Sequence, residues 1–184
     1  MSPILLDEFK FSIEYRGLPS VTTKTRSFAL LLALTLTPSG WGAAVEVSKP
    51  GPTDRCPVCG MFVARYPEWI AMVVYQDGHS HYFDGAKDLF KYLTNLPRWA
   101  PGHRVEDQRL IAVTEYYGTT AIEATQAFYV IGSDVLGPMG HELIPLTSRE
   151  EAEEFLRDHK GRRVLRYQEV TPEWLERIDQ GRFE

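Results

Sequence analysis

The sequence predicts an α+β fold in which two similar β-β-α-β units follow one another, with mainly antiparallel strands. Apolar runs rich in strand-forming residues occur in both halves of the chain. Each half also carries one amphipathic helix pattern, and a further short apolar run follows each helix. The 184 residues, of which 43% are hydrophobic, suffice for one compact domain.

The first unit is predicted between residues 62 and 114. Asp77-Gly78 is typical of a type I′ hairpin turn between two strands. Asp84 is expected to cap the following helix, whose apolar residues recur at helical spacing. The expected elements are an apolar strand run at 62–76, a strand at 79–83, a helix at 85–95 and a strand at 110–114.

The second unit has clearer helix boundaries. Ser148 and Glu151 form a capping box at the start of a helix that Gly161 terminates. Thr171 followed by Pro172 predicts the start of a last short helix. The expected elements are strands at 121–124, 127–131 and 142–146, a helix at 149–159 and a strand at 164–167.

Residues 24–44 are typical of a secretory signal peptide. Lys24 and Arg26 precede an apolar run at 27–36, and small residues follow it. The run is about half the ~20 residues needed to span a bilayer, and no cysteine for lipid attachment follows it. We therefore expect a periplasmic protein with no stable membrane anchor after signal cleavage.

Three parts of the chain are expected from this organisation. Residues 1–44 are an N-terminal extension with the signal peptide, and residues 45–55 are a flexible linker. Residues 56–184 form a metal-binding domain, with halves at about 56–117 and 118–184.

Charge and motifs exclude several functional classes. The net charge of -5 is spread along the chain without a basic stripe, so a nucleic-acid partner is not expected. The sequence contains no Gly-rich phosphate loop, nucleophile elbow or His-Glu-x-x-His run. We therefore expect a protein that is not an enzyme.

The two cysteines lie in one short run, Cys56-Pro57-Val58-Cys59-Gly60-Met61. A thioredoxin-like redox pair would require a strand before the motif and a helix after it, and the flanking residues do not predict this. A structural zinc site would need two more ligands, which His79 and His81 could supply. A plain disulfide also remains open, since the periplasm is oxidising.

Copper(I) is the metal that this run favours. The ion prefers thiolate and thioether donors, and Met61 adds a thioether next to the cysteine pair. Met139 lies in the turn-forming run Gly137-Pro138-Met139-Gly140 and could supply a third soft donor. The metal ligands expected from the sequence are Cys56, Cys59, Met61 and Met139.

Several of these runs together resemble the NosL family of nitrous oxide reductase accessory proteins. The resemblance rests on the Cys-x-x-Cys-Gly-Met run, Tyr82-Phe83-Asp84-Gly85, Ala127-Phe128-Tyr129-Val130 and Gly137-Pro138-Met139-Gly140. It implies a periplasmic copper(I) chaperone, with two β-β-α-β halves, that serves nitrous oxide reductase and its maturation machinery. It also implies Cys56, Met61 and Met139 as ligands, and leaves the role of Cys59 open.

Overall fold

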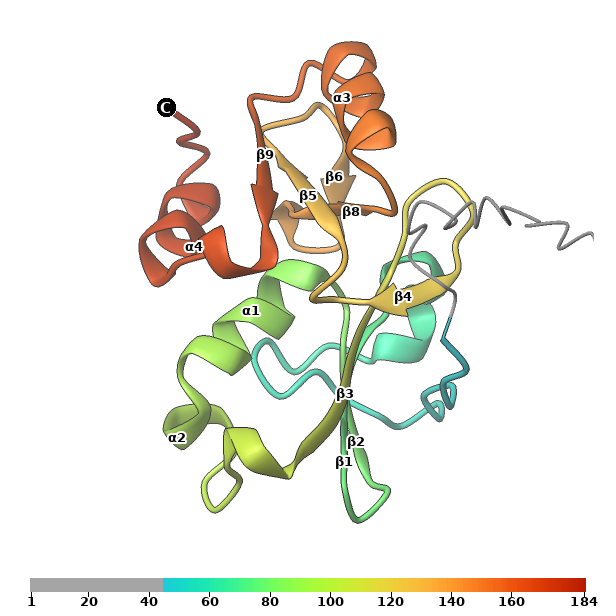
Figure 1. Ribbon diagram of the computed structural model, residues 1–184. Coiled ribbons are helices and arrows are strands. Elements are labelled where there is room, and N and C mark those ends of the chain that lie inside the picture. Colours follow the sequence, from blue (N-terminus) through green and yellow to red (C-terminus); the bar gives the residue numbers. More distant parts are fainter. Residues whose placement is uncertain (1–44) are drawn as a thin grey trace, which may run out of the picture. The chain divides into compact units, whose positions relative to one another are not determined.

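A computed structural model describes residues 45–184 of the chain (Figure 1). The predicted signal peptide and the extension before it lie outside the described residues. None of the helices within residues 45–184 is long and apolar enough to cross a membrane.

The first unit is a four-stranded antiparallel sheet in the order β2-β1-β3-β4. The helix α1 packs against β1 and β2, and the short helix α2 follows it. The elements are β1 (Ala71–Tyr75), β2 (Ser80–Phe83), α1 (Ala86–Thr94), α2 (Leu96–Trp99), the 3-10 helix η3 (Val105–Asp107), β3 (Gln108–Thr114) and β4 (Ala121–Glu123).

The beginning of this unit differs in detail from the prediction. Two 3-10 helices, η1 (Val63–Arg65) and η2 (Pro67–Trp69), occupy the first part of the run predicted as a strand. Proline at the first position of η2 lacks the N–H that a strand ladder would need there. The β1–β2 hairpin is confirmed, but only Gly78 of its turn has a positive φ, 92°, so the turn is not of type I′.

The second unit repeats the first. Its sheet has the order β8-β5-β9, with α3 packed against all three strands and a small β6–β7 hairpin inserted before β8. The elements are β5 (Phe128–Ile131), β6 (Leu136–Gly137), β7 (Gly140–His141), β8 (Ile144–Leu146), α3 (Arg149–Asp158), β9 (Arg163–Arg166), the 3-10 helix η4 (Tyr167–Glu169) and α4 (Pro172–Asp179). The predicted α+β class with two β-β-α-β units is confirmed.

The predicted place of β4 is wrong. The strand was expected to open the second unit, but Ile122 pairs with Val113 of β3 and completes the first sheet. A short connection joins β3 to β4, and strands joined in this way usually pair with each other. The boundary between the two sheets therefore falls after β4.

The helix ends follow the predicted capping chemistry in the second unit. Ser148 Oγ accepts from the backbone N–H of Glu151, whose carboxylate accepts from the N–H of Ser148. Thr171 likewise accepts from the N–H of Trp174 at the start of α4. Both contacts satisfy N–H groups that a helix leaves free at its first turn.

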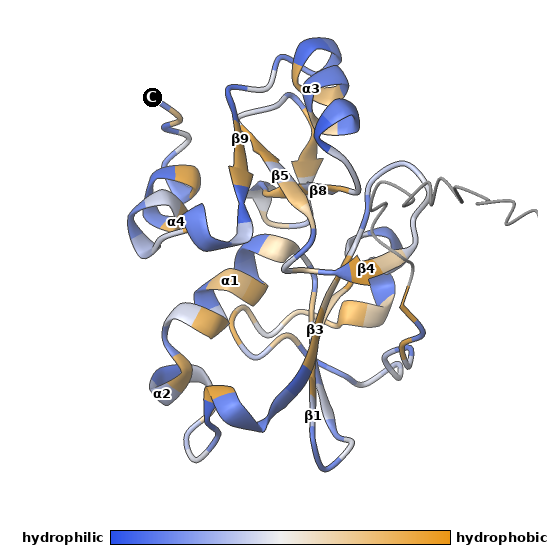
Figure 2. Ribbon diagram, viewed as in Figure 1, coloured by the Kyte–Doolittle hydropathy of each residue, from blue (hydrophilic) through white to orange (hydrophobic). Residues whose placement is uncertain are grey.

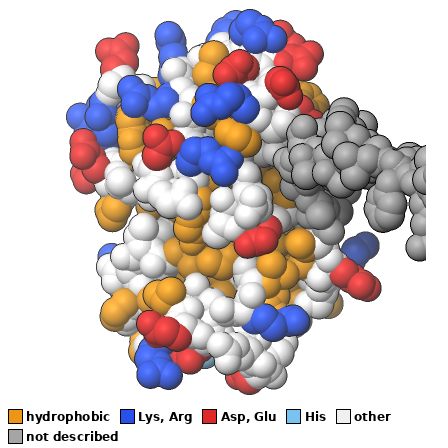
Figure 3. All heavy atoms as spheres, in the orientation of Figure 1, with side chains coloured by type: hydrophobic (Ala, Val, Ile, Leu, Met, Phe, Trp, Pro, Cys, Tyr) orange, Lys and Arg blue, Asp and Glu red, His pale blue; other side chains and the backbone are white. Residues whose placement is uncertain are grey.

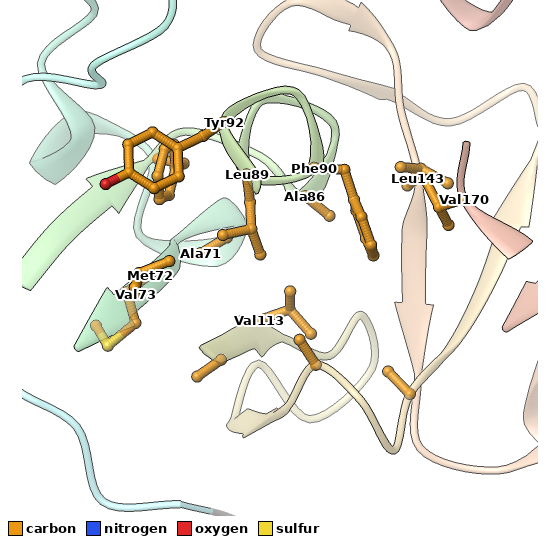
Figure 4. Close-up of a cluster of buried hydrophobic side chains, with 14 of the residues drawn as sticks. Ala71, Met72, Val73, Ala86, Leu89, Phe90, Tyr92, Val113, Leu143 and Val170 are labelled. Carbon is orange, nitrogen blue, oxygen red and sulfur yellow. The ribbon is translucent and has the colours of Figure 1, made fainter. Parts of the chain in front are cut away.

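The largest buried cluster contains residues of both units. Leu89 and Phe90 of α1 lie beside Val113 of the first sheet, and Leu143 and Val170 of the second unit lie on the other side of Phe90 (Figure 4). Phe90 also meets the ring of Tyr129, which lies in β5, edge to face at 5.1 Å between centroids. The strands of the second sheet consist largely of hydrophobic residues, whereas α3 consists largely of hydrophilic ones (Figure 2).

Residues 45–55, predicted as a flexible linker, contact the folded part. The Val45 N–H donates to Ala121 O over 2.9 Å, and Ser48 Oγ lies 2.8 Å from Tyr82 Oη. A groove of about 170 Å³ lies between this segment and strands β1, β3 and β4. Figure 3 shows hydrophobic side chains gathered on the molecular face that includes β3.

Candidate metal site

The cysteine run forms a tight turn before η1. The Cys56 N–H donates to Met61 O over 2.9 Å, and the Gly60 N–H donates to Cys56 O over 2.9 Å. Gly60 has a φ of 79°, which a residue with a side chain adopts only at a cost in free energy. The turn places both thiols on one side, with Cys56 only 2% exposed and Cys59 half-buried.

Two carboxyl groups at the start of α1 accept hydrogen bonds from the thiols. Cys56 Sγ donates to Asp88 Oδ2 over 3.5 Å, and Cys59 Sγ donates to Asp84 Oδ1 over 3.1 Å. One ligand atom from each of the four residues lies within 4.8 Å of the other three. The four side chains therefore form a single cluster that could surround one cation.

The expected role of Asp84 as a helix cap is wrong. The N-cap position of α1 is Gly85, and Asp84 bonds to Cys59 instead of to the N–H groups of the first turn. Asp84 Oδ2 is buried and has no hydrogen-bond partner among the described residues. A buried carboxylate oxygen without a partner is costly, and a bound cation or its ligands would remove that cost.

Burial and the nearby carboxylates keep both thiols protonated in the absence of metal. Burial raises the pKa of Cys59 to about 12, and the Asp84 carboxylate adds to the rise. Burial raises the pKa of Cys56 still further, with Asp88 acting in the same direction. A reactive redox thiol has a lowered pKa and lies at a helix N-terminus, so this pair does not have the thioredoxin arrangement.

One of the two predicted methionine ligands lies in the cysteine turn, and the other lies on a hairpin that contacts α1. Met61 belongs to the cysteine turn itself and is half-buried. Met139 is 46% exposed in the turn between β6 and β7. Its carbonyl oxygen accepts from Lys87 Nζ over 3.3 Å, and Lys87 immediately precedes Asp88 in α1.

A buried glutamate joins the Met139 hairpin to the start of α1. Glu142 Oε1 accepts from the Lys87 N–H over 2.5 Å and from the Leu143 N–H over 2.9 Å. A Cβ at Gly85 would overlap the Glu142 carboxylate, and one at Gly137 would lie 3.1 Å from Glu142 Cγ. The motifs at 82–85 and 137–140, both noted in the sequence, thus contact each other through this side chain.

The histidines proposed to complete a zinc site lie elsewhere. Within residues 45–184, the ring nitrogens of His79 and His81 cluster with His103 and not with the cysteines. The partners that the sequence did not reveal are the two aspartates. The four-residue spacing of Asp84 and Asp88 could have indicated that they lie together, because side chains four residues apart at a helix lie on one face.

These features define a class of protein: an α+β domain of two β-β-α-β units with a preformed thiol and carboxyl cluster suited to a metal ion. The chain belongs to the NosL family, whose model matches residues 47–175. A copper-binding lipoprotein NosL from Stutzerimonas stutzeri is 29% identical over 161 residues, which cover 80% of each chain.

A solved structure supports the fold. The crystal structure described as that of the copper chaperone NosL from Shewanella denitrificans matches with a TM-score of 0.57 and 21% sequence identity. The match covers 70% of this chain and 97% of the other. The two proteins therefore share the same fold.

Proposed function

We propose that this chain is a periplasmic copper(I) chaperone that delivers the ion for assembly of the copper centres of nitrous oxide reductase. The observation that carries the proposal is the convergence of Cys56 and Cys59 with two carboxyl groups on one point. Membership of the NosL family supports it, as does the copper-binding relative from S. stutzeri. The client enzyme is proposed from the family resemblance.

Sulfur atoms are the donors we assign to copper(I). The ion is soft, so Cys56, Cys59, Met61 and Met139 suit it better than the hard carboxylate oxygens nearby. The carboxylates of Asp84 and Asp88 instead accept hydrogen bonds from the protonated thiols while no metal is bound.

Proton competition makes such a site exchangeable. Both thiols have raised pKa values, so copper(I) must displace their protons to bind. Reprotonation favours release, which is what a carrier requires. The exposed side chain of Met139 offers a soft donor at the surface, where the ion could pass to a partner's ligands.

Competition for copper(I) against a chromophoric chelator tests the binding site. In the reduced chain, Cys56→Ser and Met61→Leu should each weaken the affinity, by at least about tenfold for the cysteine. Met72→Leu is the matched control, because Met72 is buried in β1 and lines the groove beside residues 47–50. Equal affinities in all four proteins would refute the proposed ligands.

Transfer to the client needs a separate experiment. The copper(I)-loaded chain is mixed with copper-free nitrous oxide reductase in the presence of a chelator that holds free copper below the level the enzyme can take up. We expect recovery of the absorption of the copper centres with the wild-type chain and not with Cys56→Ser. Recovery that is the same without the chain would refute delivery.

A further inference from the structure

A second cluster of metal-binding side chains lies at the turn end of the β1–β2 hairpin. His79 and His81 come from the hairpin, and His103 comes from the loop after α2. One ring nitrogen of each lies within 4.8 Å of the other two. The ring centroids are 5.3 Å apart for His79 and His81, 5.0 Å for His79 and His103, and 5.5 Å for His81 and His103.

Two of the three imidazoles are held through their Nδ1 atoms. His79 Nδ1 lies 2.5 Å from Asp77 Oδ1, and His81 Nδ1 lies 2.6 Å from Tyr92 Oη. With Nδ1–H donating to these oxygens, the lone pair of Nε2 is free to bind a metal. In known metal sites, the ring nitrogen that does not bind the metal donates a hydrogen bond of this kind to a carboxylate or another oxygen, and this bond orients the imidazole.

The buried ring of Tyr75 packs against two of the three histidines. The Tyr75 ring stacks on His79 with centroids 4.4 Å apart and an interplanar angle of 6°, and it lies 4.5 Å from the ring of His103. The Tyr75 hydroxyl forms a hydrogen bond with the Tyr92 hydroxyl, which also contacts His81 Nδ1. The histidines themselves are half-buried, so they are constrained on one side and reachable from solvent on the other.

We propose that His79, His81 and His103 form a second metal site, which binds a divalent first-row transition-metal cation through three imidazole nitrogens. Neutral imidazole suits Zn²⁺, Ni²⁺ and Cu²⁺, and Cu²⁺ is bound most tightly in this series. The cation therefore differs in charge and in donor preference from copper(I) at the cysteines.

The histidine site is independent of the proposed copper(I) function, because the two clusters share no ligand. His81 and Asp84 are three residues apart along an extended segment, which separates their Cα atoms by about 10 Å. The two sites could therefore be filled separately.

A copper(II) titration of the tag-free Cys56→Ser/Cys59→Ser chain tests the proposal, since removal of the thiols prevents reduction of the metal. We expect one equivalent of Cu²⁺ with nitrogen hyperfine coupling in the electron paramagnetic resonance spectrum. In this background, His79→Gln and His103→Gln should each lower the affinity by at least about tenfold, as measured by competition with glycine.

His159→Gln is the matched control. His159 also lies beside an aspartate, with Nδ1 3.3 Å from Asp134 Oδ1, and also stacks on an aromatic ring, that of Phe155. Its substitution should leave the affinity for Cu²⁺ unchanged. Equal affinities in the His79, His103 and His159 variants, or no stoichiometric binding, would overturn the proposal.

Further measurements separate a loss of binding from a loss of folding and test the order of the metal affinities. Circular dichroism shows whether each variant is folded. The Tyr92→Phe substitution removes the hydroxyl that orients His81. This variant should therefore bind Cu²⁺ more weakly while its fold persists. Calorimetry with Zn²⁺ shows whether the site accepts a second divalent ion, and zinc bound more tightly than copper would contradict the proposed order. Failure of copper(I) binding in the wild-type chain would leave this test unaffected.

Discussion

At the scale of single residues, Asp84 helps to keep the Cys59 thiol protonated in the metal-free site. Burial raises the pKa of the Cys59 thiol, and the Asp84 carboxylate, which accepts a hydrogen bond from that thiol, raises it further. A neighbouring negative charge disfavours the thiolate, so the site holds its proton until a cation compensates that charge.

Replacing Asp84 by asparagine should make Cys59 more reactive. The loss of the charge lowers the pKa of the thiol, which increases the thiolate fraction at pH 8. We expect faster alkylation of Cys59 by iodoacetamide in the Cys56→Ser background, measured by mass spectrometry. Asp158→Asn, an exposed change on α3, is the control, and equal rates in both variants would contradict this role of Asp84.

The sequence predicts the local part of the site and misses the distant part. The cysteine pair and Met61 are recognisable because they lie in one short run whose donor types favour a soft metal. The contacts with Asp84 and Asp88 depend on how the turn packs against α1, and the approach of His103 to His79 depends on the fold of a separate loop. Such long-range contacts leave no periodic pattern in one sequence.

At the scale of elements, the start of α1 and the β6–β7 hairpin interlock around Glu142. Gly85 and Gly137 provide the space for its side chain, and its carboxylate accepts the Lys87 N–H at the first turn of α1. This contact explains why glycine suits both motifs that flank the site. It also fixes the Met139 turn relative to the helix that carries Asp88.

Gly85→Ala should destabilise the chain by about 1 to 3 kcal/mol, because the added methyl group overlaps the Glu142 carboxylate. The backbone of Gly85 is extended, so overlap and not backbone strain is the cause. Urea denaturation of the single variants and of Gly85→Ala/Glu142→Ala gives a double-mutant cycle. Additive losses in the cycle would show that the two side chains do not compete for space.

At the scale of the whole molecule, the two β-β-α-β units share one buried cluster, in which Phe90 meets Tyr129. The sequence predicts both units because hydrophobic periodicity and capping residues are local. It misassigns β4, because the choice of sheet is a tertiary property. Glu142 adds a polar contact from the second unit to α1 of the first.

The burial of Glu142 makes the stability of the chain depend on pH. Burial raises the pKa of Glu142 to about 8, against 4.5 for an ordinary glutamate, although Lys87 opposes the rise. Between these values the folded chain binds a proton that the unfolded chain releases, so stability falls as the pH rises toward 8. Glu142→Gln should remove this dependence.

Denaturation of the wild-type chain and Glu142→Gln at pH 5 and pH 9 measures the effect. The variant should gain stability relative to wild type at pH 9, by at most a few kcal/mol, and little at pH 5. A difference that stays constant with pH would show that Glu142 titrates normally in the folded chain.

X-ray absorption at the copper edge of the reduced chain, loaded with less than one equivalent of copper(I), examines the ligands themselves. If sulfur atoms of Cys56, Cys59, Met61 and Met139 bind the ion, the spectrum of the wild-type chain contains two to four sulfur scatterers, and Cys56→Ser loses at least one of them. A first shell made only of nitrogen and oxygen would contradict the account.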